Sequence, residues 1–172
     1  MTAVSALARI PVGVVVERRK ATSQWIDFVW QPVAVLPGLP DAAPWTILAS
    51  DADRTTFYAG PAQIALYRTE TGQYRENLSS GSPSLWVALR PTGAEPAYDI
   101  VAVTADPAEG ESFTQAGDDL VEALAMPPTV RDMVAAFVAE HHVERPFVKR
   151  KRDRADPDAL GRRPPIAKDR NE

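Results

Sequence analysis

The sequence predicts a mainly β fold: a small antiparallel barrel or sandwich of about eight strands with one C-terminal amphipathic helix and a disordered basic tail. Three observations lead to this prediction. Between residues 10 and 105, short β-branched and aromatic runs alternate with Pro, Gly, Asp and Ser. One later stretch has helical periodicity instead. The segment beyond that stretch is basic and contains almost no apolar residues, so it cannot bury enough surface to fold alone.

Two long strands begin the predicted sheet. The first, Ile10–Arg18, has an apolar residue at every second position, which predicts a buried face of Ile10, Val12, Val14 and Val16. The second, Trp25–Leu36, has an apolar face made of Ile26, Phe28, Trp30, Ala34 and Leu36. Pro32 indicates that this second strand lies at a sheet edge or contains a bulge, because proline cannot donate a hydrogen bond to a neighbouring strand.

Six shorter strands and one strong helix follow. We expect the strands at residues 45–49, 55–59, 63–67, 85–90, 98–105 and 120–126, with the pair at 85–90 and 98–105 in the centre of the sheet. A single helical turn is expected near residues 74–78. The strong helix is Thr129–His142, whose apolar residues recur at i, i+3, i+4 and i+7. Thr129 is the expected N-cap.

The composition excludes several kinds of chemistry. The 172 residues include no cysteine, which excludes disulfides, thiolate zinc sites, iron–sulfur clusters and a cysteine nucleophile. The two histidines, His141 and His142, are adjacent, and successive helical residues point about 100° apart. They are therefore poorly placed to bind one ion. No phosphate-binding loop, dinucleotide fingerprint or nucleophile elbow occurs. We expect no metal, no cofactor and no catalytic residue.

The chain divides into an acidic body and a basic tail. We expect a single β-rich domain over residues 8–148 and a disordered tail over residues 149–172. The first 148 residues carry ten basic and eighteen acidic residues, a net charge of −8, whereas the tail carries nine basic and five acidic residues, a net charge of +4. The acidic body and the lack of interleaved aromatic residues argue against nucleic acid as the partner. An acidic protein partner, the chain's own body and a purely solubilising role remain open for the tail.

No membrane segment is expected. No apolar run approaches the roughly 20 residues of a membrane span, and the N-terminus lacks the basic region of a signal peptide. We therefore expect a cytoplasmic location. The sequence makes no prediction of the oligomeric state.

Two segments and one further arginine are the candidate partner- or ligand-binding sites. The segment Tyr67–Asn77 interrupts the apolar rhythm with side chains that are frequent in recognition surfaces. The alternative is a surface connection whose tyrosines pack on the body. The tail offers a dense basic run. The candidate residues are Tyr67, Arg68, Tyr74, Arg75, Asn77, Arg90, Lys149, Arg150, Lys151 and Arg152. The four tryptophans, at positions 25, 30, 45 and 86, are interpreted as core or rim packing.

Several stretches resemble an uncharacterised bacterial family of unknown function. The resemblance covers roughly residues 8 to 150 and rests on Ile10–Arg19, Trp30–Gly38, Leu66–Glu70 with Tyr74–Leu78, Pro83–Arg90 and Val103–Pro107. Members of that family are typically encoded beside molybdenum formate dehydrogenase genes and their maturation factors, which include a ferredoxin-like protein and a chaperone. The resemblance implies a helper role in assembling or supplying a redox enzyme, and it implies no catalytic residue.

Three functional hypotheses follow. The first is a cytoplasmic accessory protein for assembly or maturation of a molybdenum formate dehydrogenase, acting by binding a protein partner, either an enzyme subunit or a maturation factor. The second is a small-ligand-binding β-barrel that recognises an anionic, molybdopterin-like ligand through Arg68, Arg75 and Arg90. The third is a hydrolase that uses loop carboxylates at positions 106, 109, 111, 118 and 119. A ligand site predicts a deep polar pocket, whereas an accessory protein predicts a packed interior and an exposed apolar or charged patch.

Overall fold

A computed structural model describes residues 5–115, 117–144, 146 and 148. The chain forms two units, Met1–His142 and Val143–Glu172, and the helices and strands below all belong to the first. Their order is β1 (Ala8–Lys20), β2 (Phe28–Pro37), β3 (Thr46–Ser50), β4 (Arg54–Leu66), α1 (Thr71–Ser79), β5 (Ser84–Pro91), β6 (Tyr98–Thr104), α2 (Pro107–Phe113), β7 (Leu120–Ala125) and α3 (Pro128–His141), with a short 3₁₀ turn at Arg68–Glu70.

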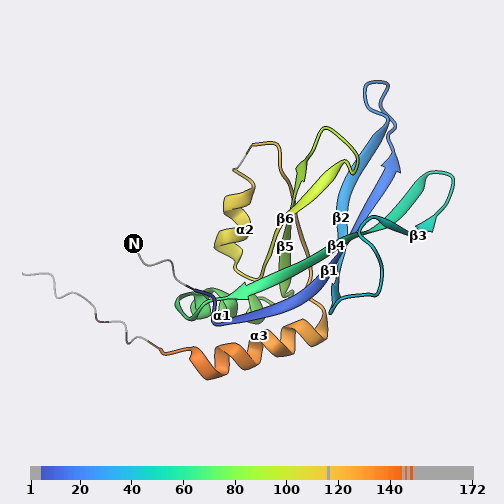
Figure 1. Ribbon diagram of the computed structural model, residues 1–172. Helices are drawn as coiled ribbons and strands as arrows, with labels where there is room; N and C mark the ends of the chain where they lie inside the picture. Colours follow the sequence, from blue (N-terminus) through green and yellow to red (C-terminus); the bar gives the residue numbers. More distant parts are fainter. Residues whose placement is uncertain (1–4, 116, 145, 147, 149–172) are drawn as a thin grey trace, which may run out of the picture. The chain divides into compact units, whose positions relative to one another are not determined.

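The strands form two antiparallel sheets. The first has the order β2-β1-β4-β3 and the second β6-β5-β7 (Figure 1). β4 lies beside β6, and β2 lies beside β7. Among the described residues the ladders do not close, so the mainly β prediction is confirmed but the barrel is not formed. The expected central pair is half correct, because β5 is the central strand of its sheet and β6 is an edge strand.

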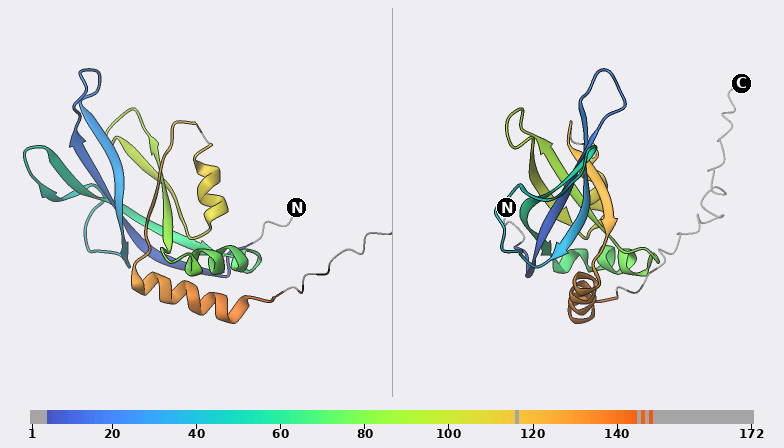
Figure 2. Two further views of the ribbon diagram at one scale, coloured as in Figure 1. Left: turned by 180° about the vertical axis from the view of Figure 1, so that it is seen from behind. Right: turned by 90° about the vertical axis from the view of Figure 1, so that its right-hand side faces the viewer.

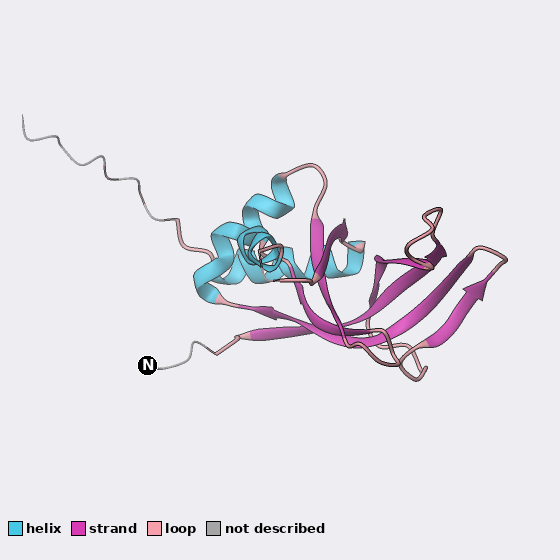
Figure 3. Cartoon of the chain, turned by 90° about the horizontal axis from the view of Figure 1, so that it is seen from above, coloured by secondary structure: helices cyan, strands magenta, loops and turns pink. Residues whose placement is uncertain are grey.

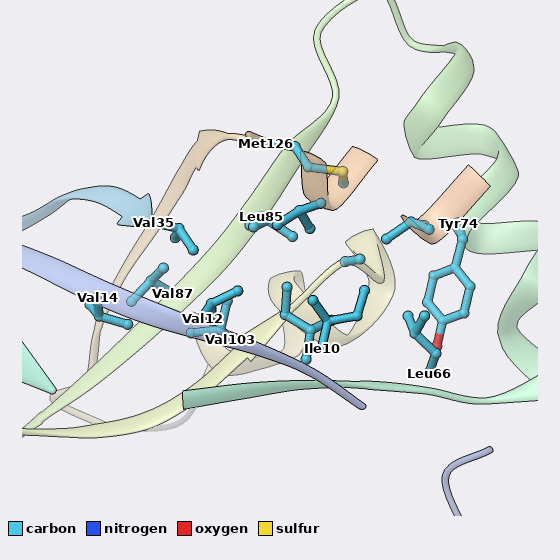
Figure 4. Close-up of a cluster of buried hydrophobic side chains, with 14 of the residues drawn as sticks. Ile10, Val12, Val14, Val35, Leu66, Tyr74, Leu85, Val87, Val103 and Met126 are labelled. Carbon is cyan, nitrogen blue, oxygen red and sulfur yellow. The ribbon is translucent and has the colours of Figure 1, made fainter. Parts of the chain in front are cut away.

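One core lies between the two sheets. The predicted inward face of β1 is confirmed, since Ile10, Val12, Val14 and Val16 are each 3% exposed or less. Side chains from β5, β6 and α3 complete the same cluster, among them Leu85, Val87, Val103, Val130 and Val134. Figure 4 shows several of these side chains meeting between the strands. Strands of both sheets and the helix α3 therefore share one hydrophobic cluster.

Pro32 lies both on an edge strand and in a bulge, as its residue type indicates. Val15 pairs with Ala34 whereas Val16 pairs with Pro32, so one residue of β2 is left out of the ladder. The extra residue changes which side chains face inward. The face containing Phe28 and Trp30 therefore continues at Val35, which is 5% exposed. The predicted continuation through Ala34 and Leu36 is wrong for this reason.

Other boundaries also differ from the prediction. The two strands expected at residues 55–59 and 63–67 are one strand, β4, which shifts register near Gly60 (φ 140°). The expected helical turn is the longer α1. The helix α2 was not predicted, although Asp106 caps it and Pro107 occupies its first turn. α3 begins at Pro128 rather than after a Thr129 cap.

The helices lie at the end of the first unit where β1 begins and β4 ends. Seen from above, the helices gather at one end and the strands of the first sheet extend towards the other (Figure 3). From behind, the β1–β2 hairpin and the β3–β4 hairpin project beyond the second sheet (Figure 2). No helix among the described residues has the length and apolar character needed to cross a membrane. The predicted tail, residues 149–172, lies outside the described residues.

Candidate functional site

Tyr74 belongs to the interior rather than to the surface. Its side chain is 1% exposed, and its ring meets that of Phe137 on α3 edge-on at 6.2 Å. The Tyr74 hydroxyl accepts a hydrogen bond from the backbone N–H of Tyr67 at 3.0 Å. Burial raises the pKa of Tyr74 to about 12. Tyr67 itself is half-buried. The alternative prediction for this segment, in which its tyrosines pack on the body, is therefore correct for Tyr74.

Asn77 is also buried, and its side chain joins three elements. Its Nδ2 donates to the backbone carbonyls of Ser84 at 2.8 Å and Ala105 at 2.9 Å, while its Oδ1 accepts from the Ser84 N–H at 3.0 Å. These bonds attach the end of α1 to the start of β5 and to the residue after β6. Both the Nδ2 group and the Oδ1 atom of the Asn77 amide are therefore hydrogen-bonded within the protein. Asn77 is 4% exposed and positions the fold around it.

Arg68 and Arg75 remain at the surface. Arg75 donates to Nε2 of His142 at 3.3 Å, and Nδ1 of His142 lies 3.1 Å from the Thr71 hydroxyl. Because arginine is always the donor, His142 accepts at Nε2 and carries its proton at Nδ1. The chain Arg75–His142–Thr71 thus links α1 to the end of α3. The ring of His141 instead contacts that of Phe137 in a tilted arrangement, at 4.5 Å between ring centroids.

Arg90 is engaged in a bidentate ion pair. Its Nε donates to Oδ1 of Asp119 at 3.0 Å and its Nη2 to Oδ2 at 2.8 Å. The pair joins the end of β5 to the turn before β7, and the guanidinium lowers the pKa of Asp119. Arg90 is six residues along β5 from Ser84, or about 20 Å. It therefore does not converge with Arg68 and Arg75 on one anion. The tail candidates Lys149, Arg150, Lys151 and Arg152 lie outside the described residues.

The loop carboxylates mostly have structural roles. Asp106 accepts from the Ala108 and Glu109 backbone N–H groups, and Glu109 accepts from the Thr104 hydroxyl. Three surface pockets of about 440 to 460 Å³ open to solvent, and none is lined by an arginine. Two of them contain carboxylates: the pocket of about 440 Å³ has Glu76 and Glu111 in its lining. The pocket of about 450 Å³ is lined by Tyr67, Thr69, Glu70, Tyr74, Asp106 and Glu109.

An aromatic cluster lies at the end of the first sheet that is opposite the helices. We call it the aromatic end and define it as Arg18, Phe28, Trp30, Trp45, Phe57 and Tyr98. Trp30 is its centre: its ring stacks on Phe57 at 5.7 Å, meets Trp45 edge-on at 6.2 Å and lies 5.7 Å from Tyr98. Trp30, Trp45 and Tyr98 pack against the core on one side. The cluster is therefore anchored in the fold while part of it reaches solvent.

Exposed apolar side chains border the aromatic end. Trp25 and Ile26, in the loop before β2, are 92% and 54% exposed. Ile47 on β3 pairs directly with Phe57 and is 58% exposed, and the next residue, Leu48, is 50% exposed. We call these four residues the apolar rim. Apolar residues gathered around an aromatic cluster on one end of a protein are typical of an interaction site.

Arg18 is the charged centre of this surface. Its guanidinium lies over the rings of Phe28, Trp30 and Phe57 at 4.5, 5.6 and 5.5 Å. The residue pairs with Trp30 across β1 and β2, so it continues the inward face of Val14 and Val16. The interpretation of the tryptophans as packing is correct for Trp30 and Trp45, which pack against the core on one side, and wrong for Trp25, which is 92% exposed. The period-two pattern of β1, extended to Arg18, was the sequence signal that could have placed this arginine on the inward face.

One family comparison bears on this chain. A family model described as "Protein of unknown function (DUF3305)" matches residues 11–151. The chain belongs to this family. The matched range agrees with the uncharacterised family expected from the sequence, and in the described structure the DUF3305 region contains nearly all of β1 and every later strand and helix. No curated protein and no solved structure matches the chain significantly.

Proposed function

We propose that this DUF3305 protein is an accessory protein for a molybdenum formate dehydrogenase and that it acts by binding a protein partner through the aromatic end and its apolar rim. The observation that supports this proposal is the exposed apolar surface around Trp30, with Trp25 at 92% and Ile47 at 58% exposure. Covering such side chains with a partner would release free energy of about 25 cal/mol per Å² of apolar surface buried, since water solvates them poorly. The partner is inferred from the family resemblance.

The composition of the aromatic end favours recognition of a protein. Interface residues that contribute most to binding are enriched in Trp, Tyr and Arg, and they are surrounded by apolar contacts that exclude water. Here Trp30, Tyr98 and Arg18 lie together, and the rim supplies the surrounding contacts. By contrast, Arg90 lies apart from the other two arginines of the ligand hypothesis and is neutralised by Asp119.

The proposal is tested by disrupting the rim without disturbing the core. The double variant Trp25→Ser/Ile47→Thr removes two exposed side chains, so its melting temperature should stay near that of the wild type. A tagged wild-type chain, expressed in its own bacterium, should co-purify with the formate dehydrogenase, and the double variant should not. Leu39→Ser is the matched control, because Leu39 is 59% exposed and follows the other end of β2.

A genetic readout completes the test. Deleting the gene should lower formate dehydrogenase activity in cell extracts, and the wild type and Leu39→Ser should restore it while the double variant should not. The truncation that ends at Val148 separates the tail from the aromatic end. If the truncated chain captures the enzyme as well as the full chain does, the tail is not the contact. An unaffected deletion strain together with no co-purification would reject the proposal.

A further inference from the structure

Four cations lie close together at the end of β1 and the start of β4, and they differ in whether a carboxylate pairs with them. Arg19 and Arg54 both pair with Glu17, at 3.2 and 3.5 Å, and Lys20 reaches Asp53 at 4.0 Å. Arg18 has no ion pair within the described part of the chain; its contacts are the faces of three aromatic rings. Arg19 and Arg54 are register partners on the outer face, whereas Arg18 lies on the inward face with the aromatic residues, as does Lys20, which pairs in register with Phe28.

We infer that Arg18 is a carboxylate-recognition residue and that the partner presents an Asp or Glu side chain flanked by apolar residues to the aromatic end. This inference rests on the proposed function and specifies the chemistry of the partner. The guanidinium carbon lies over three aromatic rings and forms no ion pair within the described residues, so its N–H donors are available for a bidentate bond to a carboxylate. Since the rings restrict the side chain before binding, little rotamer freedom remains to be lost.

The surroundings of Arg18 strengthen an ion pair formed there. The side chain is only partly exposed, and Phe28 and Trp30 lower the local dielectric constant compared with water. Apolar side chains of the partner would cover Trp25 and Ile47 on the rim and exclude water from the pair. An exposed arginine without such neighbours would contribute little.

Charge argues for a protein segment over a nucleic acid. Aromatic rings and an arginine can also stack on bases, but phosphate backbones need a basic groove. Arg19, Lys20 and Arg54, the cations next to Arg18 along β1 and at the start of β4, are paired with carboxylates, and the first 148 residues carry a net charge of −8. A polyanion would be repelled, whereas a single carboxylate among apolar groups matches one unpaired arginine.

The test uses a displayed library of random peptides rather than the dehydrogenase. Selection on the wild-type chain, with counter-selection on Arg18→Gln, should enrich peptides in which Asp or Glu is flanked by apolar residues. Binding of a synthesised peptide should weaken about 10- to 100-fold with Arg18→Gln, as expected for loss of a hydrogen-bonded charge pair. Replacing the peptide's acidic residue by its amide should weaken binding equally and should add nothing in the Arg18→Gln background.

Two control variants define the result. Arg19→Gln removes the neighbouring charge on the opposite face of β1 and should leave peptide binding unchanged. Arg18→Lys keeps the charge but loses the planar fork, so it should give an intermediate affinity. Near-ultraviolet circular dichroism of Trp30 and Trp45 checks that each variant keeps the cluster.

Several results would overturn the inference. They are enrichment of apolar peptides without an acid, equal binding to Arg18→Gln, no peptide above the Arg18→Gln background, and occupation of the aromatic end by a single-stranded oligonucleotide. Self-association in sedimentation that Ile47→Thr abolishes would identify a second copy as the occupant and would also overturn it. The proposed function fails differently, through absence of the dehydrogenase from the wild-type co-purification.

Discussion

Asn77 and Ala105, 28 positions apart in the sequence, are joined by a 2.9 Å hydrogen bond from the Asn77 amide to the Ala105 carbonyl. The same amide also bonds Ser84 in both directions. A side chain on α1 thereby satisfies backbone groups that neither the helix nor the sheet ladder satisfies. It holds α1 against the second sheet at the place where β5 begins and β6 ends.

Asn77→Ala should destabilise the protein markedly. The substitution leaves the Ser84 N–H and two carbonyls without partners in a buried place, which costs about 1–3 kcal/mol. Ser79→Ala is the control, because the Ser79 hydroxyl is exposed and bonds only the Glu76 carbonyl in its own helix. It should change the free energy of unfolding by less than about 0.5 kcal/mol. Urea unfolding measures both, and equal stability of the two variants would contradict this role for Asn77.

Gly110→Ala should be poorly tolerated, because α2 approaches Trp86 at this residue. A Cβ at position 110 would lie 2.2 Å from Cγ of the Trp86 ring. The helix or the indole would have to move, at a cost of about 1–3 kcal/mol. Gly72→Ala in α1 is the matched control: nothing lies within 4 Å of its added Cβ, so the gain in helix propensity should stabilise by about 0.5–1 kcal/mol. Thermal unfolding should therefore show shifts of opposite sign.

The Arg90–Asp119 pair should make stability depend on acid pH. Arg90 lowers the pKa of Asp119 below its ordinary value of 3.8 in the folded protein. A carboxyl group whose pKa is lower in the folded than in the unfolded state stabilises the protein at pH values above the unfolded pKa. This stabilisation is lost as the pH falls through the folded pKa. Asp119→Asn should therefore be less stable than the wild type at pH 7, and the difference should shrink below about pH 4. A difference that grows in acid would contradict the pair's contribution.

The buried phenol of Tyr74 should make stability depend on alkaline pH. Its pKa is raised from 10.0 to about 12, mainly by burial. A raised folded pKa means that its contribution to stability is complete below pH 10 and is lost as the pH rises through the folded value. Tyr74→Phe should remove this alkaline loss and, at neutral pH, cost about 0.5–1.5 kcal/mol for the bond from the Tyr67 N–H.

Difference absorbance between the wild type and Tyr74→Phe follows the ionisation directly. A single phenol ionising near pH 12 is expected in the folded wild type. A difference spectrum that titrates near pH 10 while the protein remains folded would show that the hydroxyl is not buried as described.

Local patterns determined much of the fold. Alternation in β1 identified Ile10 to Val16 as the inward face, because side chains of a strand alternate whatever lies opposite. Pro32 marked the edge and the bulge, since its missing N–H is a property of the residue. The turn at Asp51 is also a local structure, because its carboxylate accepts from the Asp53 and Arg54 N–H groups at 2.9 and 2.8 Å.

Tertiary structure alone decided the site. The phase of β2 depends on which residue the bulge omits, and that is set by pairing with β1. The composition of Tyr67–Asn77 is the same whether its polar side chains face solvent or bond inward. The burial of Tyr74 and Asn77 therefore depends on the elements that pack beside them. Likewise, an arginine after a valine strand is an ordinary strand end. It becomes an unpaired cation on aromatic rings only because β2 and β4 bring Trp30 and Phe57 beside it.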